Sequence, residues 1–235
     1  MGKEKFSYTK QFEALAKISQ AITSNLYLED ILKLIVTVTA QVMDSKICSL
    51  LLLDEEREEL VIKATQSVSE AYNKKPNLKL GEGIAGRVAR EGKPITVLDV
   101  RKDPRYINRR IAEKEGLCSL LSVPLKVKGK VIGVLNVYTS KPHRFRKEEI
   151  NILMTVANQS AVVIENAHLL TESKIIREEL EARKLIERAK GILMKEENLS
   201  EEDAFRKIQK YAMDNRRSMR EVAEAIILTH EMKTK

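Results

Sequence analysis

The feature that most constrains the fold of this chain is a long segment without glycine or proline, from His143 to Lys190. Both residue types interrupt helices, so their absence over 48 residues favours one continuous helix, which we predict from Arg146 to Lys195. Its apolar residues recur at close to heptad spacing, at Ile152, Val156, Val163 and Leu170. A single helix of this length is unusual in a compact domain.

The pattern of this helix predicts contact between two copies of the chain. The polar residues Gln159 and Asn166 lie on the apolar seam, and a neighbouring apolar line runs through Leu169, Ile176 and Leu180. A long apolar stripe with polar interruptions is typical of a parallel two-helix coiled coil, here over residues 146–185. The alternative is one helix that packs on its own domain and then kinks.

Two more helices are predicted after Gly191. Ser200 and Ser218 are candidate N-caps, followed three residues later by Asp203 and Glu221. The predicted buried residues of the two helices are Ala204, Ile208, Tyr211 or Ala212, Met219, Val222, Ala223, Ile226 and Ile227. With the end of the long helix, these helices predict an all-α three-helix domain over residues 172–235.

Basic side chains gather on this helical domain. Between Phe205 and Arg220 there are six basic residues and one acid. The net charge of the chain does not carry this argument: of the total of +8, the 15 bases and 14 acids after Leu170 supply only +1. Clustered arginine and lysine favour a phosphate-bearing partner, and the predicted contacts are Arg188, Lys190, Arg206, Lys207, Lys210, Arg216, Arg217 and Arg220. The alternative is a solvated helix face.

Three segments of this domain resemble the ANTAR family of bacterial RNA-binding antitermination domains. They are AKGILM at Ala189–Met194, LSEEDAFRKIQKYAM at Leu199–Met213 and REVAEAI at Arg220–Ile226. The resemblance implies binding to paired stem-loops in a nascent transcript, which prevents a terminator hairpin from forming. A dimer that presents two such domains fits two stem-loops.

The middle of the chain predicts an antiparallel sheet in the α+β class. Lys46–Leu53 and Leu60–Thr65 flank a charged turn, and Leu117–Val127 and Lys130–Tyr138 are joined at Lys128-Gly129. Helices are expected within Gly81–Glu91, within Pro104–Glu115, and in two amphipathic stretches between Lys10 and Met43, the first with Phe12, Leu15, Ile18/Ser19 and Ile22.

This middle part resembles a GAF sensor domain. The matching segments are Leu80–Val100, Asp103–Tyr106 and Ser119–Tyr138. The resemblance implies a sheet of five or six antiparallel strands that binds a small molecule, binds a partner protein, or dimerises; its ligand is unknown. The domain is expected over residues 1–168.

Several motifs are interpreted as structural. Gly81, Gly83 and Gly86 match a dinucleotide-binding pattern, but a polar segment precedes them where that fold requires a buried strand. Asp54 follows an apolar strand but heads a charged turn, so we do not expect it to be phosphorylated. Cys48 and Cys118 are expected to be reduced core residues.

The sequence therefore predicts a dimeric cytoplasmic regulator rather than an enzyme. Its scattered histidines predict no metal site, and no apolar run is long enough for a membrane span. One alternative is a DNA-binding regulator that uses Ser218–Leu228 as its recognition helix, although Glu221 and Glu224 would face the DNA backbone. Another is a GAF-type ligand enzyme with a dimerising tail.

Overall fold

The computed structural model describes residue 16 and residues 27–67 and 69–233. The chain divides into two compact units, and the division falls between His168 and Leu169. The first of the helical stretches predicted near the N-terminus, with Phe12 and Leu15, lies outside the described residues. In the described part of the chain, no helix is both long and apolar enough to cross a membrane.

The first unit is built on one six-stranded antiparallel sheet, which confirms the predicted fold class. The strand order is β3-β2-β1-β6-β5-β4. The strands are β1 (Ile47–Asp54), β2 (Glu59–Thr65), β3 (Leu78–Lys79), β4 (Ile95–Val97), β5 (Leu120–Val127) and β6 (Lys130–Tyr138). Lys128 and Gly129 both have positive φ, as the predicted tight turn between β5 and β6 requires.

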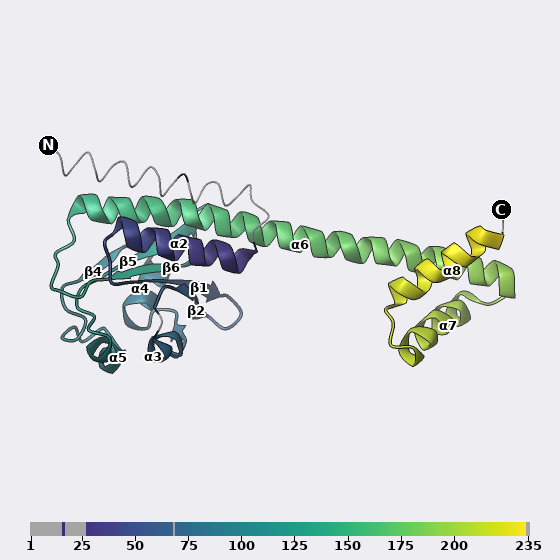
Figure 1. Ribbon diagram of the computed structural model, residues 1–235, viewed down its shortest axis with the longest axis horizontal. Helices are drawn as coiled ribbons and strands as arrows, with labels where there is room; N and C mark the ends of the chain where they lie inside the picture. Colours follow the sequence, from purple (N-terminus) through teal and green to yellow (C-terminus); the bar gives the residue numbers. More distant parts are fainter. Residues whose placement is uncertain (1–15, 17–26, 68, 234–235) are drawn as a thin grey trace. The chain divides into compact units, whose positions relative to one another are not determined.

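Helices cover both faces of this sheet (Figure 1). Helix α2 (Leu28–Val42) and the first part of α6 (Lys147–Glu197) lie on one face. The short helices α3 (Glu70–Asn73) and α5 (Arg109–Lys114) lie on the other face together with α4 (Gly83–Glu91). Because both faces are covered, the central strands are buried along most of their length.

Successive residues of a strand therefore face different helices. In β1, Cys48 and Leu50 belong to the core under α2 and α6, whereas Ile47 packs with the residues of α3, α4 and α5. Ser49 lies between these apolar residues and is also buried. The alternation places one buried polar side chain on the face opposite α6.

The long helix α6 is continuous, as predicted, but part of its apolar stripe is used within the chain. Val156 and Val163 are buried in the core of the first unit. These two side chains therefore cannot contact a second copy of the helix. For this part of α6 the alternative is correct, namely that the helix packs on its own domain. Leu170 is 66% exposed, and the neighbouring line through Leu169, Ile176 and Leu180 is also exposed.

The second unit is the predicted helical domain. The end of α6 packs with α7 (Glu201–Asp214) and α8 (Met219–Lys233) around a core that includes Ala204, Ile208 and Ala223. Both predicted caps form: the hydroxyl of Ser200 accepts the N–H of Asp203 at 3.1 Å, and that of Ser218 accepts the N–H of Glu221 at 3.2 Å.

The glycine pattern before α4 is a turn, as predicted from the sequence. Gly81 and Gly83 have φ of 88° and 62°, which glycine adopts without strain. The N–H of Gly81 donates to the carbonyl of Gly86 at 2.8 Å. A Cβ at Gly86 would lie 2.4 Å from the carbonyl oxygen of Lys79, so this glycine allows α4 to approach the end of β3.

We predict that Gly86→Ala lowers the free energy of unfolding of the first unit by about 1–3 kcal/mol, because backbone must move to admit the methyl group. Gly191→Ala is the matched control, since a Cβ there meets no other atom within 4 Å. It is expected to stabilise the second unit by about 0.5–1 kcal/mol. Urea denaturation followed by circular dichroism measures both; a destabilised Gly191→Ala with a neutral Gly86→Ala would contradict this account.

Candidate functional site

Most of the predicted basic contacts of the second unit are paired with carboxylates. Arg206 donates to Glu202 at 2.6 Å, Arg220 donates to Glu224 at 2.9 Å, and Lys207 pairs with Glu197. Arg188 pairs with Glu231 at 2.7 Å and Arg217 with Glu221 at 3.4 Å. These side chains are all solvent-exposed, so each pair is weak and a phosphate can replace the carboxylate.

Lys190 differs from the other predicted contacts because it is only 6% exposed. Its ammonium lies 2.8 Å from Glu201 and 3.0 Å from Glu187, and the hydrogen bonds to these two carboxylates raise its pKa. Lys190 therefore links α6 to the start of α7. The prediction that it reaches a nucleic acid does not fit this position, and we leave it out of the candidate surface.

Lys210 and Arg216 have no ion pair within the described part of the second unit, and both are exposed. Arg216 follows α7 with a φ of 51°, in the left-handed region that favours glycine. Its N–H donates to Met213 and that of Arg217 donates to Ala212, so the two close the helix end as a Schellman motif. Glycine would adopt this left-handed backbone with less strain, but it would not supply the cation that Arg216 supplies.

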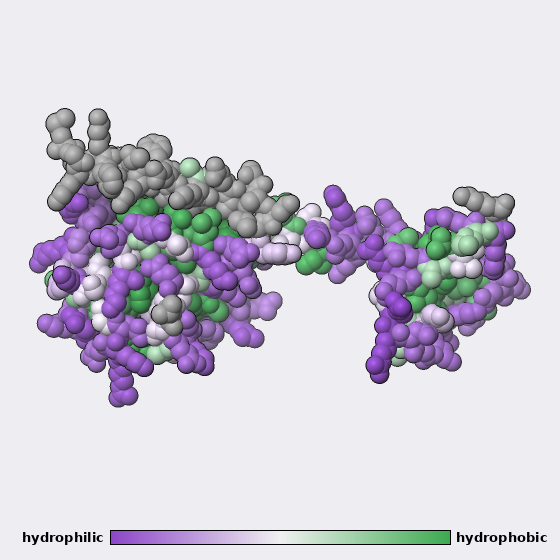
Figure 2. All heavy atoms as spheres, viewed as in Figure 1, coloured by the Kyte–Doolittle hydropathy of each residue, from purple (hydrophilic) through white to green (hydrophobic). Residues whose placement is uncertain are grey.

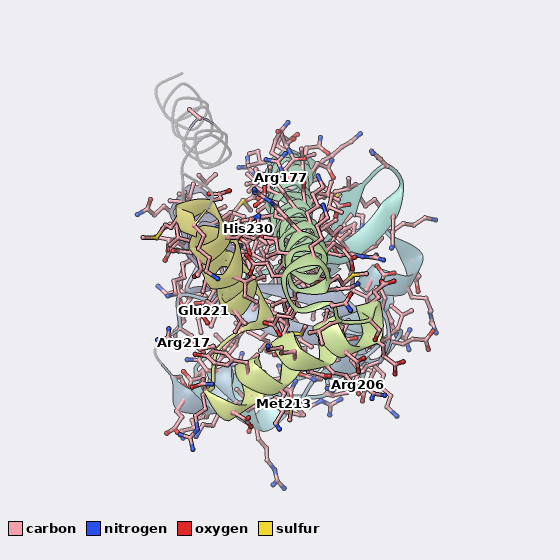
Figure 3. All side chains as sticks on the ribbon, turned by 90° about the vertical axis from the view of Figure 1, so that its right-hand side faces the viewer. Arg177, Arg206, Met213, Arg217, Glu221 and His230 are labelled. Carbon is pink, nitrogen blue, oxygen red and sulfur yellow. The ribbon has the colours of Figure 1, made fainter. Side chains whose placement is uncertain are left out.

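Helix α7 also exposes aromatic and apolar side chains. Tyr211 is 59% exposed and Met213 is 72% exposed, and Phe205 is also partly open to solvent. The sequence left Tyr211 or Ala212 as the buried residue at this position; Ala212 is buried and Tyr211 is exposed. Figure 3 shows Met213 and Arg206 on α7 and Arg217 beside Glu221 at the start of α8. An exposed ring on a helix that also exposes cations suits the stacking of unpaired bases.

We call the exposed set on α7 and the following turn the α7 surface. In Figure 2 the second unit is mainly hydrophilic on the face shown, with hydrophobic groups between the charged ones. The α7 surface consists of Arg206, Lys207, Lys210, Tyr211, Met213, Arg216 and Arg217.

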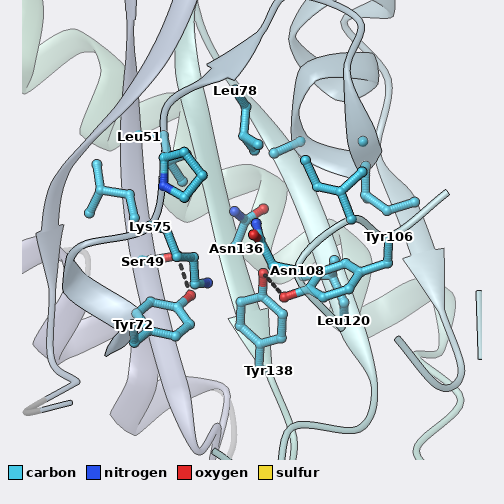
Figure 4. Close-up of a pocket in the computed structure, with 16 residues that line it drawn as sticks. Ser49, Leu51, Tyr72, Lys75, Leu78, Tyr106, Asn108, Leu120, Asn136 and Tyr138 are labelled. Carbon is cyan, nitrogen blue, oxygen red and sulfur yellow. Dashed lines mark hydrogen bonds between the residues drawn. The ribbon is translucent and has the colours of Figure 1, made fainter. Parts of the chain in front are cut away.

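The first unit contains a pocket on the sheet face opposite α6. Tyr72, Tyr106 and Tyr138 form its walls; the ring centroids of Tyr72 and Tyr106 lie 6.1 and 6.4 Å from that of Tyr138, in edge-to-face contact. Tyr106 donates to, or accepts from, the hydroxyl of Tyr138 at 3.4 Å (Figure 4). The free volume is about 30 Å³, room for one or two water molecules.

A row of polar side chains crosses three strands, and two of its members, Ser49 and Asn136, line this pocket. Ser49 of β1 pairs in register with Asn136 of β6, which pairs with Ser122 of β5. All three are buried, and Tyr72 donates to the hydroxyl of Ser49 at 3.0 Å. In the described part of the chain, the Ser122 hydroxyl and the Asn136 side-chain carbonyl have no hydrogen-bond partner. Such groups mark a place where a bound molecule would be stabilised.

The pocket also contains one cation, Lys75. Its ammonium lies over the ring of Tyr72, 3.2 Å from the centroid, and 5.6 Å from the centroid of Tyr138. Burial lowers the pKa of Lys75 to about 7, while the charge of Glu115 acts in the opposite direction. Burial raises the pKa of all three tyrosines, which therefore stay neutral at physiological pH.

Sequence reasoning did not identify this pocket, although two signals point to it. Ser49, Ser122 and Asn136 interrupt apolar strands on one face, which a period-two reading of the strands detects. The DPRY segment ends at Tyr106, and Asp103 accepts the N–H of Arg105 at 2.9 Å to shape that turn. Cys118 is not among the pocket residues; it is buried, and it forms no disulfide with Cys48.

Comparison with known families assigns a domain family to each of the two units. The GAF domain family matches residues 26–165, and the ANTAR domain family matches residues 175–227. The chain belongs to the GAF–ANTAR family. Its GAF domain contains the pocket, and its ANTAR domain carries the α7 surface.

The relatives of the two domains are different proteins. The methyl sulfide methyltransferase-associated sensor of Methanosarcina acetivorans is 30% identical over 166 residues, 67% of this chain and 17% of the relative. The transcriptional regulatory protein PdtaR of Mycobacterium tuberculosis is 48% identical over 58 residues, 25% of this chain and 28% of the relative. This chain thus spans less than a third of either relative.

Among solved structures, the GAF domain is similar to that of a phosphoenolpyruvate-protein phosphotransferase from Coxiella burnetii. The TM-score is 0.62 at 29% identity, over 70% of this chain and 98% of the other.

We predict that the free energy of unfolding of the GAF domain rises as pH increases from about 7 towards 10.5, through Lys75. In this window the unfolded chain binds a proton that the folded domain does not, so higher pH favours folding. Lys75→Met should remove this increment, and Lys74→Met, an exposed neighbour paired with Glu70, should not. Urea midpoints of the three proteins across the window measure it; parallel profiles for wild type and Lys75→Met would refute it.

Proposed function

We propose that this protein is a signal-responsive, RNA-binding regulator that prevents transcription termination. The ANTAR domain binds stem-loops in nascent RNA, which places its action in the cytoplasm, and the GAF domain supplies sensory input. The protein acts as a regulator and not as an enzyme. The observation that carries the proposal is the ANTAR match over residues 175–227, combined with the α7 surface on that domain.

The chemistry of the α7 surface supports RNA over duplex DNA. Lys210 and Arg216 offer cations free of ion pairs in the described part of the domain, and Tyr211 offers a ring that unpaired loop bases can stack on. Helix α8 is a poorer candidate for a DNA-reading helix, because Glu221 and Glu224 are exposed along it and take up the charge of Arg217 and Arg220.

We further propose that the chain is a homodimer through the middle of α6. Val162, Leu169 and Ile176 are exposed and recur every seven residues, and Leu180 extends this line. We call these four residues the α6 stripe. Exposed apolar residues at heptad spacing on a charged helix favour a second helix as partner. Two copies then present two ANTAR domains to two stem-loops.

Loss of a cation from the α7 surface is expected to weaken RNA binding without loss of folding. Lys210→Ala and Arg216→Gly should each reduce the affinity for an RNA stem-loop, and should flatten its salt dependence by about 0.7 per cation. Arg216→Gly should keep or raise stability, because glycine relieves the left-handed backbone. Asn198→Gly is the matched control: it makes the same backbone change at a φ of 53° and removes no cation.

Tyr211 separates base stacking from charge in the same assay. Tyr211→Ala should weaken loop binding about fivefold or more, since stacking contributes ~1–3 kcal/mol per base, whereas Tyr211→Phe should retain it. Fluorescence anisotropy with a labelled stem-loop and a matched DNA duplex measures each variant. Wild-type affinity in both Lys210→Ala and Tyr211→Ala, or equal affinity for the two nucleic acids, would exclude RNA recognition by this surface.

Charged substitutions on the α6 stripe are expected to separate the dimer. Wild-type protein should sediment as a dimer at micromolar concentration, and Leu169→Lys with Ile176→Lys should be monomeric and still folded, because both side chains are exposed within one chain. Glu178→Lys with Glu181→Lys, which adds two lysines away from the stripe, is the control. Analytical ultracentrifugation that finds a monomeric wild type, or equal dissociation in both double variants, would disprove the dimer.

A further inference from the structure

The charge inside the GAF pocket is not balanced by the residues that line it. Of the sixteen lining residues, Lys75 is the only one with a basic side chain, and none carries a carboxylate. In the part of the chain that the structure describes, no carboxylate lies within ion-pair distance of its ammonium. The acid that acts on it, Glu115, does so from farther away and accepts a hydrogen bond from Ser69 at 2.5 Å.

The start of α4 faces the same space. Gly83, Ile84 and Ala85 line the pocket, and the N–H groups of a first helical turn have no acceptor within the helix. The side chain of Glu82 does not cap this turn; its carboxylate accepts the N–H of Lys79 at 2.9 Å. The positive end of the helix dipole is therefore open towards the pocket, which favours an anion.

The polar row adds hydrogen-bonding groups of both kinds. The Asn136 side chain is 3% exposed and lines the pocket, and its carbonyl oxygen is an unused acceptor. The Asn136 amide nitrogen and the hydroxyl of Ser49, which also lines the pocket, are the donors of this row. A molecule that fits here must accept hydrogen bonds from the helix and also donate one to the sheet.

We propose that this pocket binds a small organic carboxylate that also carries a hydrogen-bond donor, of the size and chemistry of lactate. Its carboxylate lies between the ammonium of Lys75 and the start of α4, and its donor reaches Asn136. A cationic ligand is disfavoured, because Lys75 already occupies the face of the Tyr72 ring. Since the free volume is only about 30 Å³, the side chain of Lys75 shifts to admit the ligand while its ammonium stays in contact with the carboxylate. The inference rests on the sensory role proposed for the GAF domain.

The test uses the full chain without RNA. Acetate, lactate, pyruvate, inorganic phosphate, lactamide and tetramethylammonium are titrated at pH 6.5 by calorimetry and by tyrosine fluorescence. The chain has no tryptophan, and three of its six tyrosines line the pocket. Lactate should bind at least tenfold more tightly than lactamide, its neutral counterpart of similar size. Preference for phosphate or tetramethylammonium, or no binding of any of the three carboxylates, would overturn the proposal.

Two variants assign the binding to the pocket. Lys75→Met should weaken lactate binding at least tenfold, and Lys74→Met should leave it unchanged. Above pH 7 the affinity of wild type should fall by up to about tenfold per pH unit as Lys75 loses its proton. The three pocket tyrosines stay neutral in this range, because burial raises their pKa values. Equal lactate affinity in both variants would refute the site.

The outcomes separate this inference from the proposed function. If lactate and its relatives fail to bind while the stem-loop still binds, only the ligand class is lost. If the carboxylate binds but no RNA does, the pocket stands and the regulatory proposal fails. A carboxylate that binds and also shifts stem-loop affinity supports both, because a ligand acts on a second site only through a difference in affinity between two states.

Discussion

The burial of α6 against the sheet of the GAF domain is the interaction on which the other features depend. Leu153, Val156, Val163 and Ile164 complete the core that α2 and the strands begin. Because these residues are used within the chain, the face of α6 available to a partner is the α6 stripe. One helix thus supplies a core, the proposed dimer contact and, at its end, the first helix of the ANTAR domain.

The sequence predicted the elements whose signals are local. The capping pairs Ser200–Asp203 and Ser218–Glu221 fixed the starts of α7 and α8, and two left-handed residues fixed the turn before β6. It failed where the outcome depends on distant neighbours. The repeat that contains Val156 and Val163 has the same spacing whether it faces a second helix or the core of its own domain. Tyr211 and Ala212 are adjacent, and the sequence pattern does not show which of them is buried. The pocket was missed because its residues come from seven separate segments of the chain.

Charge on the ANTAR domain is balanced locally, and this affects how it can recognise RNA. The carboxylates beside Arg206, Arg217 and Arg220 must be displaced before phosphates can take their place, so long-range attraction contributes little. Selectivity then depends on short-range contacts. Tyr211, an exposed ring, and Arg216, an exposed arginine in a left-handed backbone conformation, are the residues that folding alone explains least. The same local balance explains why net charge was a poor guide to function.

The central claim is that the ANTAR domain recognises RNA, and crosslinking in the cells that produce the protein tests it most directly. After ultraviolet crosslinking, the bound nucleic acid is sequenced and the crosslinked peptide is identified by mass spectrometry. The account predicts RNA enriched in paired stem-loops upstream of terminators, attached to the peptide that contains Tyr211. Recovery of DNA, of RNA without shared stem-loops, or of crosslinks confined to the GAF domain would contradict it.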